Sequence, residues 1–79
     1  MGEWATHTPD GRRLQVRREN ATWIASCGEA SEARNELLDV ALMEAIRQDH
    51  AVVAHSPQVE YGAWIRTQAD RIERDFSRR

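Results

Sequence analysis

Residues 12–20, RRLQVRREN, hold four arginines in nine positions. Guanidinium groups bind phosphates and carboxylates well, because their planar set of donors can form two parallel hydrogen bonds. Such a run is typical of a nucleic-acid interface when the arginines share one exposed face. Its chemistry therefore depends on the element that carries it and on the direction in which each arginine points.

The histidines and the cysteine are the next candidates for chemistry. His7, His50 and His55 lack the spacing of helical metal ligands, and the single Cys27 allows neither a cysteine zinc site nor an intrachain disulfide. We therefore expect no metal site. We expect Cys27 to be a buried, inert thiol, because free cysteine is among the residue types most often buried.

Carboxylates gather between residues 29 and 50. Since they spread around a predicted helix and form no oxygen-rich calcium loop, we interpret them as a solvated acidic flank. The chain also contains no P-loop, GxGxxG, GxSxG or HExxH motif. We therefore expect no enzymatic activity, no catalytic residue, no cofactor and no small-molecule substrate. The carboxylates are Glu29, Glu32, Glu36, Asp39, Glu44 and Asp49.

The stretch WATHTPDGRRLQV predicts a β-hairpin. Pro9 suits the second position of a type I turn, and Gly11 suits the left-handed residue that closes a three-residue loop. This turn places Trp4 opposite Val16, which brings two apolar side chains to one face. The other predicted pairs are Ala5–Gln15, Thr6–Leu14 and His7–Arg13.

A second reversal, with a loop of two or four residues, is predicted at residues 18–21, before TWIASC. It would pair Arg17 with Thr22, Val16 with Trp23, and Leu14 with Ala25. The two hairpins together predict a sheet that is apolar on one face and polar on the other. The apolar face collects Trp4, Thr6, Leu14, Val16, Trp23, Ala25 and Cys27. The polar face collects His7, Arg13, Gln15, Arg17, Thr22, Ile24 and Ser26.

Two helices are predicted to follow. The first spans residues 31–49, with Ser31 as its N-cap. The second spans residues 57–77, with Pro57 at its first position. The fold class is therefore α+β: a three-stranded antiparallel meander over residues 1–28, followed by two helices, βββαα, in one domain of residues 1–79. Residues 50–56 form a link, in which 51–54 are either a loop or a short fourth strand.

The βββα layout resembles that of the arm-binding domains of tyrosine recombinases and that of plant AP2-type domains. The segment TWIASCGEASEARNELLDVALMEAI resembles the strand-then-helix run of HicB-type antitoxins, but it lacks their Gly–Thr turn and Asp–Glu–Ala helix start. These likenesses imply a small DNA-binding regulator of antitoxin-like or phage-like type.

Charge and hydropathy limit the other classes of partner. The net charge of −2 gives no bulk attraction to nucleic acid or to acidic membranes. We expect no membrane-spanning segment, because the sequence contains no run of about eighteen apolar residues. We expect the protein to be cytoplasmic.

Two surfaces are therefore candidates for binding. The polar sheet face binds a partner or nucleic acid, or is a solvated surface whose arginines pair with Glu19 or Glu3. Strand 22–27 ends the predicted meander without a charge or a proline, so we expect its edge to be covered, either by residues 51–54 as a fourth strand or by the same strand of a second chain in a dimer. The face residues are Arg13, Gln15, Arg17 and Thr22; the edge residues are Thr22, Ile24, Ser26 and Trp64.

We expect a non-catalytic protein-interaction or regulatory module that forms a homo-oligomer or binds another protein. The alternative is nucleic-acid binding through the arginine-bearing sheet face.

Overall fold

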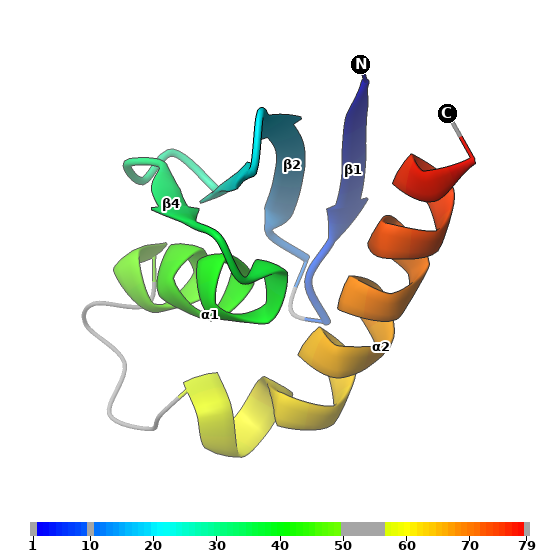
Figure 1. The fold of residues 1–79 in the computed structure, drawn as a ribbon. Helices are drawn as coiled ribbons and strands as arrows, with labels where there is room; N and C mark the ends of the chain where they lie inside the picture. The colour runs from blue at the N-terminus through cyan, green and yellow to red at the C-terminus, as the bar shows by residue number, and fades with distance from the viewer. Residues whose placement is uncertain (1, 10, 50–56, 79) are drawn as a thin grey trace.

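A computed structural model describes residues 2–9, 11–49 and 57–78, with the backbone alone for 57–61. It shows one antiparallel sheet in the order β1-β2-β3-β4, with both helices on one side of it (Figure 1). The predicted α+β class, with strands first and two helices last, is confirmed. The elements are β1 (Glu3–His7), β2 (Arg13–Glu19), β3 (Thr22–Cys27), β4 (Ala33–Asn35), α1 (Leu38–Asp49) and α2 (Pro57–Ser77).

The first hairpin confirms its predicted register residue for residue, including Trp4 opposite Val16. Gly11 has a φ of 90°, and its amide donates to the Thr8 carbonyl over 2.8 Å. A residue with a Cβ rarely adopts this φ, so the glycine closes the turn. The turn chemistry therefore determines which strand residues face each other.

The second hairpin differs from its prediction by two residues. Glu19 faces Thr22, and Val16 faces Ala25 instead of Trp23. The turn consists of Asn20 and the residue after it, and Asn20 has a φ of 58°. Asparagine tolerates this left-handed conformation, so the centre of the turn lies one residue later in the sequence than predicted. A shift of two residues leaves every side chain on its predicted face.

The first helix begins at Leu38, so the prediction that Ser31 caps a helix over residues 31–49 is wrong. Instead, β4 pairs with β3, with Ala33 opposite Ala25. This pairing satisfies the backbone groups along part of the β3 edge. Asn35 then ends the strand, because its Oδ1 accepts a hydrogen bond from the Leu37 amide over 2.9 Å.

The second helix has the predicted bounds, Pro57–Ser77. The fourth strand lies at Ala33–Asn35, and the alternative strand at residues 51–54 falls outside the described residues. Neither helix, in the part of the chain that the structure describes, is long and apolar enough to cross a membrane.

The core lies between the sheet and the two helices. Trp23 joins the layers, since its ring meets that of Phe76 edge-on with centroids 5.2 Å apart. Leu42 of α1 is fully buried, whereas Leu37, just before this helix, is 62% exposed. The buried core residues are Leu14, Val16, Trp23, Ala25, Cys27, Ala33, Leu38, Ala41, Leu42, Ala45, Ile46, Ile65, Ala69 and Ile72.

We predict that Leu42→Ala lowers the free energy of unfolding by about 2–5 kcal/mol, because it leaves a cavity in the core. Urea unfolding followed by circular dichroism measures this change. The matched control, Leu37→Ala, removes the same atoms from an exposed site and should change stability by no more than about 0.5 kcal/mol. Equal losses in the two variants would contradict the packing described here.

Candidate interaction surface

The arginine run is divided between the two faces of the sheet. Arg18 lies on the core side, with its guanidinium carbon 4.9 Å from the centroid of the Trp23 ring, in a cation–π contact. Arg12 turns to the end of α1, where its Nη1 lies 2.7 Å from Oδ2 of Asp49. These two arginines contact groups of the fold, so only Arg13 and Arg17 of the run at residues 12–20 lie on the outer face.

The ion pair of Arg12 and Asp49 closes one end of the domain. Asp49 ends α1, where the helix dipole disfavours a negative charge, and the guanidinium of Arg12 offsets this cost. The Sγ of Cys27 lies 3.8 Å from the same Oδ2 and is fully buried. The predicted burial of this thiol is confirmed. Gly28 follows it with a φ of 61°, so the chain can turn directly against the carboxylate.

Neither helix covers the outer face of the sheet (Figure 1). Because side chains alternate along a strand, the odd-numbered residues of β1 and β2 and the even-numbered residues of β3 and β4 point to this face. Its side chains include three arginines and three glutamates, so their formal charges cancel. They are Glu3, Arg13, Arg17, Glu19, Glu32 and Arg34.

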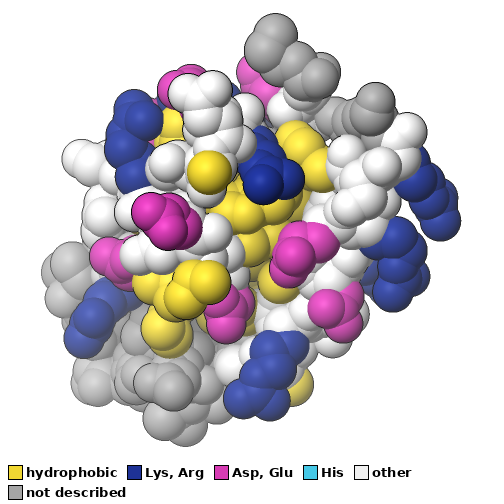
Figure 2. Space-filling view, viewed as in Figure 1, with side chains coloured by type: hydrophobic (Ala, Val, Ile, Leu, Met, Phe, Trp, Pro, Cys, Tyr) yellow, Lys and Arg dark blue, Asp and Glu magenta, His cyan; other side chains and the backbone are white. Residues whose placement is uncertain are grey.

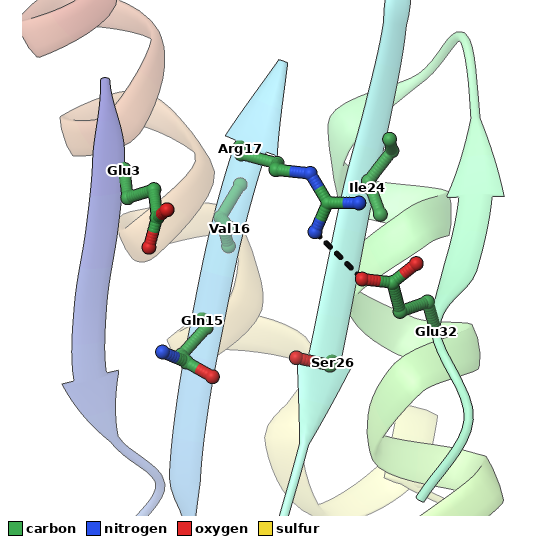
Figure 3. Close-up of a pocket in the computed structure, with 7 residues that line it drawn as sticks. All are labelled: Glu3, Gln15, Val16, Arg17, Ile24, Ser26 and Glu32. Carbon is green, nitrogen blue, oxygen red and sulfur yellow. Dashed lines mark hydrogen bonds and ion pairs between the residues drawn. The ribbon is translucent and has the colours of Figure 1, made fainter. Parts of the chain in front are cut away.

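Arg17 lies at the centre of this face and reaches across β3 (Figure 3). Its Nη1 lies 2.6 Å from Oε2 of Glu32, and its Nε lies 3.1 Å from Oε2 of Glu19. Beneath it lies Ile24, which is only 1% exposed although it stands outside the core cluster. Arg34 adds a longer contact to Glu32, at 3.4 Å. The ion pairs therefore cover a large apolar residue of a largely polar face.

A shallow hollow of about 70 Å³ lies beside this network. It has room for one or two water molecules but not for a sizeable small molecule. Figure 3 shows the side chains of Gln15 and Ser26 beside it, with Glu3 on one side and Arg17 on the other. The surface is therefore a nearly flat polar face.

The hydrogen bond from Arg17 lowers the pKa of Glu32, because it stabilises the carboxylate. The bonds to Glu32 and then to Glu19 raise the pKa of Arg17 above its already high ordinary value. Both groups are therefore charged at neutral pH.

The structure brings most of the predicted partner face together. Arg13, Gln15 and Arg17 follow one another along β2, and Thr22 lies at the turn end, opposite Glu19. The sequence suggested Glu19 or Glu3 as ion partners, and the bond from Arg17 to Glu19 confirms the first. Glu32 was not predicted as an ion partner of Arg17, because the sequence pattern assigned this glutamate to a helix.

The predicted dimer edge is covered in its middle, because β4 pairs with β3 from Trp23 to Ala25. The side chains of Ile24 and Ser26 point to the outer face, because side chains alternate along the strand. Trp64 lies on α2 and packs against the core, on the other side of the sheet. An open edge at β3 was predicted because Ala33–Asn35 was taken as helical.

The other candidates lie apart. His7 is exposed on β1, and His50 and His55 fall outside the described residues. Within residues 2–9, 11–49 and 57–78, no three His, Cys, Asp or Glu side chains are grouped to hold a metal ion.

No protein-family model matches the chain, and comparisons with curated proteins and solved structures found no match either.

We predict that Gly28→Ala lowers the free energy of unfolding by about 1–3 kcal/mol. A Cβ at this position would lie 2.7 Å from Oδ1 of Asp49, in a backbone conformation that disfavours side chains. The matched control is Gly62→Ala, which meets nothing within 4 Å and lies inside α2. It should stabilise the protein by about 0.5–1 kcal/mol. Thermal unfolding compares the stability of the two variants. Stability changes of the same sign would contradict the role of the Gly28 conformation.

We also predict that the Glu32 carboxyl titrates below the usual glutamate range, which centres on about 4.3. Because its pKa is lowered on folding, the stability that the ion pair contributes is present above this range. It is lost as the pH falls through the lowered pKa of Glu32. An NMR pH titration measures the carboxyl directly. Arg17→Gln should move the midpoint toward the usual range, because Arg17 is the largest cause of the lowered pKa and Arg34 remains, whereas Arg13→Gln should leave it unchanged. A usual midpoint in the unmodified protein would exclude a persistent ion pair.

Proposed function

We propose that this chain is a protein-interaction module that self-associates through the outer face of its sheet. The observation that supports this most is that the face is uncovered by either helix and has balanced charges. We also propose a cytoplasmic location, where a single reduced cysteine such as Cys27 is ordinary.

The charge pattern suits a second copy of the same chain. In a two-fold symmetric dimer, the same patch of both copies meets itself, so it must complement itself. Arginines and glutamates alternate over this face, and a rotated copy can place Arg13 or Arg34 opposite glutamates. The short side chains of Ala5 and Ser26 leave room for close approach.

The size of the face indicates a weak dimer. Strands lie about 4.8 Å apart and each residue adds about 3.4 Å, so the four strands form a face of roughly 20 by 20 Å. A standard interface buries about 800 Å² on each partner, which is more than this face offers. Association should therefore depend on concentration in the micromolar range or above.

Nucleic-acid binding on the same face is the alternative. Arg13 is exposed there, and Gln15 stands beside it. However, a phosphate would have to displace Glu32 from Arg17, and the three glutamates repel a polyanion. These charges support a protein partner over nucleic acid.

We predict that the protein forms a dimer. Sedimentation equilibrium at protein concentrations up to about 500 µM should detect it. Ser26→Arg should raise its dissociation constant at least about tenfold, because a long charged side chain would stand in the middle of the face. The control, Gln48→Arg, adds the same charge on an exposed site of α1 and should leave the constant unchanged.

A monomer over the whole concentration range would exclude this self-association. A second titration uses a duplex DNA of random sequence at about 50 and 200 mM salt. Binding that weakens steeply with salt and is lost in Arg13→Gln would support the nucleic-acid alternative instead.

A further inference from the structure

Strand β1 ends the sheet, and within the described residues no strand pairs with its outer edge. The amide of Thr8 donates to the Arg12 carbonyl over 2.8 Å, which makes this pair hydrogen-bonded across the hairpin. Hydrogen-bonded and non-bonded pairs alternate along an antiparallel ladder. The backbone groups of Glu3, Ala5 and His7 therefore point outward, away from β2.

The last turns of α2 cross behind β1 and extend past this edge at its Glu3 end (Figure 3). Here the half-buried Trp4 and α2 line a shallow groove of about 300 Å³. The groove-lining residues of the helix are Arg71, Arg74, Asp75 and Arg78. Basic side chains gather over this part of α2, at the right of Figure 2.

These three arginines differ from those of the outer face. No carboxylate in the part of the chain that the structure describes lies within ion-pair distance of Arg71, Arg74 or Arg78. Their spacing of three and four residues puts them on one side of the helix, over a length of about 10 Å. The groove therefore carries cationic groups that need not exchange a partner to bind an anion.

We propose that this groove binds an extended acidic peptide, which adds to the sheet as a fifth strand beside β1. The peptide backbone pairs with the outward groups of Glu3, Ala5 and His7, as in other cases of strand addition. Every second side chain of the peptide then points toward Trp4 and the helix. Two such side chains lie about 7 Å apart, so two carboxylates fit within the length that the arginines cover.

A peptide fits these observations better than a nucleic acid. Single-stranded nucleic acid would use the arginines and stack on Trp4, but it could not pair with the open backbone edge. The peptide site differs from the surface proposed for self-association. The peptide binds at the edge of the sheet, whereas self-association uses the outer face.

The test uses the full chain and a short peptide in which glutamate alternates with valine. We expect binding by calorimetry, with NMR shifts at the amides of Glu3, Ala5 and His7 and at the Trp4 indole. The double variant Arg71→Gln/Arg74→Gln should weaken binding at least about tenfold. Its matched control is the double variant Arg47→Gln/Arg66→Gln, which removes two exposed arginines outside the groove and should bind normally.

A second pair of variants tests the strand addition. Ala5→Pro removes the outward amide and should abolish binding, whereas Ala5→Ser keeps this amide and should bind normally. Circular dichroism shows whether the proline variant is folded; if it is not, a peptide N-methylated at alternate amides replaces it. Binding that survives this loss of backbone hydrogen bonds would overturn the proposal. So would failure of the peptide to bind, or tighter binding of a thymidine oligonucleotide of equal charge.

Discussion

The alternation of side chains along the strands is the constraint on which the rest of this structure depends. Leu14 and Val16 enter the core and Arg18 lies on the same side of the sheet, whereas Arg17, between Val16 and Arg18, points outward. A slip of one residue would exchange the two faces and expose the core. Gly11 and Asn20, both in left-handed conformations, hold the two turns that prevent it. Because both helices then cover the apolar side, the charged face is left at the surface.

Sequence patterns predicted the faces of the sheet better than they predicted residue pairs. The register of the first hairpin was predicted correctly, because Gly11 favours one turn over the alternatives. The second was wrong by two residues, since Arg18 to Ala21 offers several polar reversals and Asn20 selects among them only by its tolerance of positive φ. Side chains repeat every two residues, so this error left Ile24 on its predicted face.

The fourth strand and the ion pairs could not be predicted from local pattern. Ala33–Asn35 is too short for a strand signal and lies before a strongly helical stretch. Its conformation comes from pairing with β3, so it depends on an edge that exists only in the folded sheet. The same holds for Arg17 and Glu32, which are fifteen residues apart. The carboxylate was visible in the sequence, but its place depended on β4.

Ion pairing decides which arginines of this chain can bind a partner. An anion that approaches Arg17 must replace a carboxylate held at 2.6 Å, whereas Arg71 and Arg74 have no such partner among the described residues. The sheet face therefore favours a surface that supplies both signs of charge, and the groove favours an acidic chain. One surface is the outer face of the sheet and the other lies at the β1 edge, so the two proposals concern different parts of the sheet. The arginine run at residues 12–20 thus belongs to the outer face of the sheet, where the charges balance. The groove with cationic side chains that are unpaired among the described residues is formed by arginines of α2, near the other end of the sequence.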